Sequence, residues 1–236
     1  MKLNKENNFE YSISRSFLSE ETISLLNAEF GEAFNDRKAN KIYSTIVQFT
    51  AKELESSEVL SPVLEQIMLH FTDALKVSGI ALDKVWFVKS QSKDTDPNKL
   101  PYLPHFDKHR YLKAMIYLHD VVEDHGPIHF GRLLNPAEID TRRRRLPANY
   151  QDLGLNTIKA SEMISGMEPV LGKAGDVIFF DTNAAHRVLG LSVRVLKGMS
   201  LDSTLMCVDL IHKNHLSNDY SAWFLHACAK IISDNE

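Results

Sequence analysis

The sequence is poor in cysteine, and it contains no long apolar run. Its two cysteines, Cys207 and Cys228, lie in apolar stretches and are too few for a disulfide framework or a thiolate zinc site. No segment reaches the roughly 20 apolar residues that a helix needs to cross a bilayer. The polar N-terminus lacks the apolar stretch of a secretory signal. These absences predict reduced thiols, no membrane segment and a cytoplasmic location.

The chain also has no excess of positive charge. The formal net charge is −4, which argues against a general nucleic-acid-binding protein. No internal repeat or low-complexity tract divides the 236 residues. Hydrophobic residues make up 44% and charged residues 25%, so residues 1–236 are expected to form a single globular domain. Nothing in the sequence predicts the oligomeric state.

The chain is expected to begin and end with helices. Its N-terminal part, about residues 15–80, has apolar residues at helical spacing. The first helix should begin at Ser19, a favourable N-cap that two glutamates follow. The second should have Ser61 as its N-cap and Pro62 at the first helical position. Residues 219–232 have the pattern of a closing amphipathic helix.

Strands are expected between these helices, in a β core from about 84 to 205. Runs rich in β-branched and aromatic residues lie at 84–89, 113–118, 128–134, 177–180 and 193–205. Polar stretches at 92–101 and 141–166 should be loops. Strands without long helices between them predict an antiparallel sandwich or barrel. The fold should therefore be mainly β with flanking helices, and the N-terminal helices should pack on one sheet.

Three side chains are candidate metal ligands. Six of the ten histidines fall between residues 105 and 186. His105 and Asp107 are two residues apart, so on extended backbone both side chains point the same way, while Phe106 points into the core. A third ligand must come from elsewhere, and His186 follows an apolar strand 79 residues after Asp107.

Two imidazoles and one carboxylate form the facial triad of non-haem iron oxygenases, which leaves half of the octahedron open. The three-residue His-x-Asp pattern alone is a weak signal, because it arises by chance in any histidine-rich chain. Zinc accepts the same donors, so a zinc hydrolase or lyase is an alternative. A non-catalytic binding protein with a β core is another.

Two blocks of the sequence resemble the phytanoyl-CoA dioxygenase-like family of Fe(II)- and 2-oxoglutarate-dependent oxygenases. The first runs from Leu103-Pro-His-Phe-Asp107 through the strand at 112–118 to Asp120-Val121 and Gly126-Pro127. The second is the block 172–181 followed by His186. The resemblance implies a double-stranded β-helix (jelly-roll) core. It also implies Fe(II), 2-oxoglutarate and O2 as cofactor and co-substrates, and hydroxylation of a C–H bond in a small molecule. His105, Asp107 and His186 carry over as metal ligands.

The resemblance further implies a basic residue after the last histidine, which binds the distal carboxylate of 2-oxoglutarate. This chain offers Arg194 and Lys197, which point to opposite faces of a regular strand, so only one can serve. Arg194 is favoured because its strand resembles that of the family and because a guanidinium binds a carboxylate with two hydrogen bonds. The run at 128–134 departs from the family pattern, and the sequence does not identify the substrate.

Several other polar residues have competing interpretations. The run Arg142–Arg145 is either a solvated face or a docking site for an anionic substrate. His109 is either a polar residue at a loop edge or a pocket residue and fourth ligand. Three more histidines are expected mostly at the surface: His119, His125 and His129. Of these, the expectation is weakest for His129. Asp181 should cap the loop before His186 without binding metal.

Overall fold

The computed structural model describes residues 11–36, 40–41, 45–49, 56–74, 80–91, 103–125, 127–188 and 202–212. Several predictions fall outside these residues, and the structure does not test them. They are the loop at 92–101, the closing helix at 219–232, the start of the strand at 193–205, and the two basic residues Arg194 and Lys197. Among the described residues, no helix combines the length and the apolar character needed to span a bilayer.

Helix α1 (Glu20–Asp36) begins where the sequence predicts. The Ser19 hydroxyl accepts a hydrogen bond from the Thr22 N–H at 3.1 Å, and Glu20 and Glu21 occupy the first turn, where carboxylates favour the helix dipole. The side chains of Ile23, Leu26 and Phe30 are buried, as the helical spacing indicates.

Helix α3 (Leu60–Leu69) begins earlier than predicted, so Ser61 as its N-cap is wrong. Val59 already has helical dihedral angles, and the Ser57 hydroxyl accepts a hydrogen bond from the Leu60 N–H at 2.9 Å. Pro62 fits in the first turn because N–H groups there have no partner within the helix. The helix continues as a short π-helical turn, η1 (His70–Ala74).

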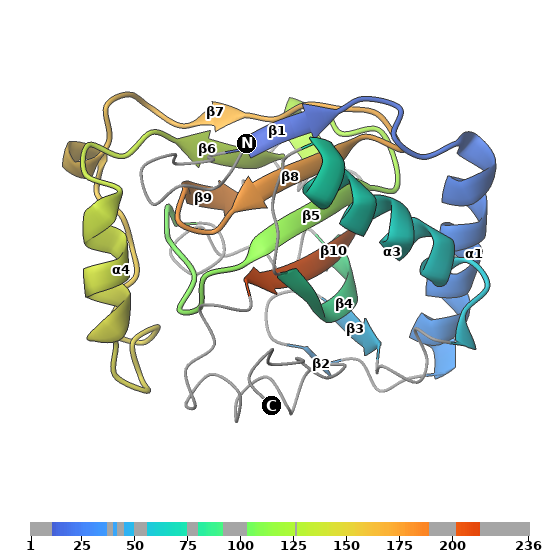
Figure 1. Cartoon of the computed structure of the whole chain (residues 1–236), viewed down its shortest axis with the longest axis horizontal. Coiled ribbons are helices and arrows are strands. Elements are labelled where there is room, and N and C mark those ends of the chain that lie inside the picture. Colours follow the sequence, from blue (N-terminus) through green and yellow to red (C-terminus); the bar gives the residue numbers. More distant parts are fainter. Residues whose placement is uncertain are drawn as a thin grey trace.

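The strands form two antiparallel sheets (Figure 1). The larger has the order β1-β8-β5-β10-β4-β3-β2. Its strands are β1 (Tyr11–Ser14), β2 (Asn40–Lys41), β3 (Thr45–Phe49), β4 (Ile80–Gln91), β5 (Leu112–Tyr117), β8 (Val177–Asp181) and β10 (Asp202–His212). The smaller has the order β7-β6-β9, with β6 (Ile128–Gly131), β7 (Glu168–Pro169) and β9 (Ala185–Val188). The prediction of a mainly β, antiparallel fold is confirmed.

Most of the stretch 141–166 is turns and irregular backbone, as its polarity predicted. Its first residues belong to helix α4 (Ala137–Arg144), however, and it includes a 3-10 turn, η4 (Ala160–Glu162). The α4 helix is too polar to show an apolar stripe, because its buried positions are Ile139 and an arginine, Arg143. A second 3-10 turn, η3 (Glu123–His125), precedes β6.

The two faces of the larger sheet bury different partners. Ala114 and Ile116 of β5 pack with α1 and α3, as do Val177 and Phe179 of β8. The alternate positions of these two strands pack with the smaller sheet: Met115, Tyr117, Ile178 and Phe180. This alternation follows from the two-residue period of a strand. The helices therefore buttress one face of the larger sheet, as predicted, and the space between the two sheets lies on its other face.

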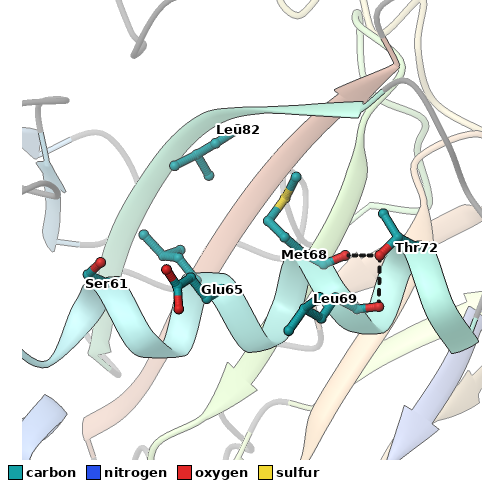
Figure 2. A pocket seen from close by; sticks show the side chains of 7 residues that line it. Ser61, Glu65, Met68, Leu69, Thr72 and Leu82 are labelled. Carbon is teal, nitrogen blue, oxygen red and sulfur yellow. Dashed lines mark hydrogen bonds between the residues drawn. The ribbon is translucent and has the colours of Figure 1, made fainter.

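A mainly apolar groove of about 580 Å³ lies between α3 and β4 (Figure 2). It is lined by Ser61, Leu64, Glu65, Met68, Leu69, Thr72 and Leu82. The Thr72 hydroxyl bonds to the carbonyls of Met68 and Leu69, so it is committed to the helix itself. The groove is on the helical side of the larger sheet, whereas His105 and His186 belong to the opposite side.

Candidate metal centre

Backbone pairing brings His105 and His186 together. The His105 N–H donates to the His186 carbonyl at 2.9 Å, and the His186 N–H donates back to the His105 carbonyl at 3.0 Å. Residues paired directly in this way project to the same side of a sheet. Their ring centroids are 4.5 Å apart. His186 comes just after strand β8, as the sequence indicated, and lies within the next strand, β9.

Asp107 completes the cluster because the backbone around Phe106 is fixed on its other side. The Phe106 N–H and carbonyl both bond to Asn156, at 3.1 and 3.0 Å, and the Phe106 ring is fully buried in a separate apolar cluster. Phe106 thus points away from its neighbours, as predicted. The Asp107 Oδ1 atom lies 3.8 Å from His105 Nε2 and 3.6 Å from His186 Nε2.

The three residues can hold one divalent ion. One ligand atom from each lies within 4.8 Å of the others, and within the described part of the chain no other group of three histidine, cysteine or acidic residues does so. Bonds of 2.0–2.2 Å would place neighbouring ligand atoms roughly 3 Å apart in an octahedron. The Oδ1–Nε2 separations of 3.8 and 3.6 Å are longer than this value by less than 1 Å.

Both imidazoles present the same nitrogen to the cluster. Nδ1 of His105 is 2.7 Å from the Leu103 carbonyl, and Nδ1 of His186 is 2.9 Å from the Ala184 carbonyl. A carbonyl can only accept, so each Nδ1 carries the hydrogen and each Nε2 keeps its lone pair. Such a second hydrogen bond is the usual way a protein orients a metal-binding histidine.

The electrostatics favour the metal-binding forms of the ligands. Burial, together with the neighbouring His186, lowers the pKa of His105 to about 3. Burial alone would raise the pKa of Asp107, but the Lys113 ammonium and the two histidines hold it well below its usual value. At neutral pH the site therefore contains a neutral His105 and an ionised carboxylate, which are the forms that bind a metal.

Lys113 is a site residue to which the sequence analysis gave no role. It lies on β5, its side chain is 12% exposed, and its Nζ is 2.8 Å from Asp107 Oδ2. It shares a strand face with Met115 and Tyr117, which point between the sheets. The signal was present in the sequence, since a lysine at an alternate position of an otherwise apolar strand needs a buried partner.

Arg143 is a second such residue. It is buried, its Nε donates to the Asp107 carbonyl at 3.0 Å, and its guanidinium also bonds to Asp140 and Asn183. The guanidinium lies 5.7 Å from the centroid of the Phe106 ring. Arg143 therefore holds both the backbone of the proposed ligand and the ring beside it.

The run Arg142–Arg145 is thus not a uniform surface, and neither interpretation of it fits all four residues. Arg142 pairs with Glu162 at 2.6 Å and donates to the Thr157 carbonyl at 2.8 Å. With Arg143 it braces the segment around Phe106. Only Arg144 and Arg145 are exposed. A docking site made of all four arginines is wrong.

The other histidines differ in their exposure. His109 lies in the loop before β5, as predicted, but its side chain is buried beside Tyr111, and it is not part of the three-residue cluster. His119 and His125 are half-buried, each with Nδ1 2.9 Å from the Asp120 carbonyl. His129 is buried on β6.

Asp181 caps the turn before His186, as predicted. Its carboxylate accepts the Asn183 N–H at 2.8 Å and the Arg110 guanidinium at 2.6 Å. The Asp181 carboxylate is therefore occupied in holding this turn and is not one of the three clustered ligands. Arg194 and Lys197 lie outside the described residues, so the assignment of either to the co-substrate stays a prediction.

No protein-family model and no curated protein matches the sequence. Solved structures do match. HygX from Streptomyces hygroscopicus, with nickel and 2-oxoglutarate bound, has a TM-score of 0.56 and 11% identity over 86% of this chain and 82% of its own. Two non-heme alpha-ketoglutarate-dependent enzymes from nogalamycin biosynthesis match similarly. For the epimerase SnoN the TM-score is 0.56, with 15% identity over 87% and 79% of the two chains. For the carbocyclase SnoK it is 0.57, with 17% identity over 86% and 79%. Identities this low show a shared fold.

Proposed function

We propose that this protein is an Fe(II)- and 2-oxoglutarate-dependent dioxygenase. The observation that carries the proposal is the convergence of His105, Asp107 and His186, with two Nε2 lone pairs and one ionised oxygen facing a common point. Support comes from the fold, which is shared with structures that hold nickel with 2-oxoglutarate, in HygX, and Fe3+ with alpha-ketoglutarate, in SnoN. The resemblance to the phytanoyl-CoA dioxygenase-like family points to the same chemistry.

The proposal includes a double-stranded β-helix core within a single domain over residues 1–236. Two antiparallel sheets pack face to face around Met115, Tyr117, Ile178 and Phe180. The proposed ligands lie at the edge of the smaller sheet, where His105 joins β9 through an isolated bridge. This arrangement suits a fold in which a metal sits between two sheets.

When bound, Fe(II) with 2-oxoglutarate and O2 supplies the oxidising chemistry that cleaves a C–H bond. The chain's own residues hold and shield that centre. His105 and His186 present Nε2, and Asp107 presents Oδ1. Phe180 lies 5.5 Å from the His186 ring, and Phe130 packs on Phe180 at 5.1 Å. These rings exclude water from one side of the centre.

Charge at the site favours an anionic co-substrate. One carboxylate beside two neutral imidazoles leaves a divalent ion with a net single positive charge. A 2-oxo acid carries the opposite charge, and the predicted contact of its distal carboxylate with Arg194 or Lys197 adds a second attraction.

The proposed reaction is hydroxylation of a C–H bond in a small molecule. HygX and SnoN have been solved with hygromycin B and nogalamycin RO bound, so proteins of this fold bind small molecules. SnoN is an epimerase and SnoK a carbocyclase, so reactions other than hydroxylation also occur on this fold. Product analysis by mass spectrometry distinguishes them, because hydroxylation alone adds one oxygen atom.

An anaerobic titration tests the metal and co-substrate assignment. Metal-free protein is given Fe(II) and then 2-oxoglutarate, and we expect the weak visible charge-transfer band of a 2-oxo acid chelated to iron. The variant Asp107→Ala should lose the band, and it should form no succinate when O2 is then admitted. Asp152→Ala, in an exposed loop, is the matched control and should keep both.

Absence of the band in folded wild-type protein would contradict the proposal. A zinc hydrolase or lyase with the same donors would instead be active with zinc and without O2.

A further inference from the structure

The two carboxylate oxygens of Asp107 have different surroundings. Oδ1 faces both histidines, at 3.8 and 3.6 Å from their Nε2 atoms. Oδ2 lies 2.8 Å from the ammonium of Lys113. One oxygen is therefore directed to the metal position, and the other is held in an ion pair.

The Lys113 ammonium is itself held in place. Lys113 lies on an inner strand, paired on one side with Phe180 of β8 and on the other with Asp209 of β10. Its Nζ lies 5.7 Å from the centroid of the Trp86 ring and 5.6 Å from that of Tyr111, within the range of cation–π attraction. With its backbone in a sheet and its charge between two rings, the lysine is a fixed partner for Oδ2.

We infer that Lys113 is a positioning residue that makes Asp107 bind the metal through one oxygen only. The inference rests on the proposed metal centre. A carboxylate can bind a divalent ion through one oxygen or two, and an ammonium on the second oxygen disfavours the two-oxygen mode.

The number of oxygens matters for the proposed reaction. Two imidazoles and one carboxylate oxygen use three positions of an octahedron and leave three open. A 2-oxo acid that chelates through two atoms would need two of these, and dioxygen would need the third. If both oxygens of Asp107 were bound, one of these positions would be lost. Lys113 thereby keeps the third position available.

The inference can be tested with Mn(II) alone, without turnover. Water-proton relaxation by protein-bound Mn(II) scales with the number of water molecules on the ion. Wild-type protein should show three such waters and Lys113→Met two, so the inner-sphere relaxivity per bound ion should fall by about one third in an octahedral site. Lys113→Arg, which keeps a cation on Oδ2, should retain the wild-type value.

Lys108→Met is the matched control. Lys108 is close in sequence, but its ammonium faces the Tyr150 ring, so its loss should leave the relaxivity unchanged. Circular dichroism checks the fold of each variant, and Lys113→Leu replaces Lys113→Met if the latter does not fold.

An unchanged water number in Lys113→Met would overturn the inference. So would the complete loss of Mn(II) binding in a folded variant, since the lysine would then be needed to form the site at all. Failure of wild-type protein to bind Mn(II) would instead overturn the metal centre, and the inference with it.

Discussion

The chemistry of the proposed ligands depends on groups that are not ligands. The carbonyls of Leu103 and Ala184 select the tautomer of the two histidines, and Lys113 keeps the nearby carboxylate ionised. Arg143 acts one step further out, through the backbone carbonyl of Asp107. Each contact alone is modest, but together they orient three donors before any metal arrives.

The contribution of Arg143 can be measured as a change in the free energy of unfolding. We expect Arg143→Met to lower the free energy of unfolding by about 2–3 kcal/mol, because it leaves the partly buried Asp107 carbonyl without this donor. Its partner Asp140 is partly exposed and can turn to water, which limits the loss. Arg145→Met is the control from the same run, and as an exposed position it should change stability by less than about 0.5 kcal/mol. Urea unfolding of both variants gives the comparison, and equal losses would show that Arg143 has no special role.

At the scale of elements, the caps and turns follow local chemistry that is only partly visible in the sequence. Helix α1 begins after Ser19, which the sequence identified, whereas α3 uses Ser57 in place of Ser61. Two serines four residues apart are equally good caps by composition. Ser57 is the residue used, and its hydroxyl also donates a hydrogen bond to Glu29 of α1 at 2.9 Å. The helix boundary therefore coincides with a contact to another helix, which the sequence does not show.

The two serines give a direct test of this boundary. Ser57→Ala should lower the free energy of unfolding by about 1 kcal/mol, since the Leu60 N–H loses its partner. Ser61→Ala should have almost no effect, because Ser61 lies inside the helix and alanine favours helical backbone. Thermal unfolding followed by circular dichroism measures both, and the reverse order of effects would restore Ser61 as the cap.

At the scale of the whole molecule, the N-terminal segment is bound to β8, the strand that comes just before His186. Strand β1 pairs with β8, and just beyond it Arg15 and Ser16 bind the carboxylate of Asp176 at 2.6 and 2.8 Å. The Lys173 N–H also donates to this carboxylate, at 2.9 Å. Asp176 therefore joins residues about 160 positions apart, next to the strand that leads to His186.

This junction predicts a pH dependence. Burial acts to raise the pKa of Asp176, but the N–H groups of Lys173 and Ser16 and the Arg15 guanidinium outweigh it and lower the pKa below 3.8. A carboxyl whose folded-state pKa is lowered stabilises the fold fully above its unfolded value, and this contribution is lost as pH falls through the folded value. Asp176→Asn should therefore cost about 1–2 kcal/mol at pH 7, a modest figure because Arg15 is more than half exposed.

The difference between wild type and Asp176→Asn should shrink as the pH is lowered from 7 toward 3. Urea unfolding across this range measures it, with the exposed Asp152→Asn as control. A difference that is constant with pH would mean that the ionised carboxylate does not hold the junction.

The amino-acid sequence by itself determined the features that repeat locally. Runs of β-branched and aromatic residues predicted β5 and β8. Two-residue alternation predicted the opposite directions of Phe106 and its two neighbours, and helical spacing predicted the buried face of α1. The resemblance of the sequence to a known family already predicted that His105 and His186 lie together. Only the tertiary structure decided that Asp107 meets Lys113 and that Phe106 meets Arg143. The physical reason is that backbone period and capping act within a few residues. Strand pairing and the burial of charge depend on partners that the chain brings together only on folding.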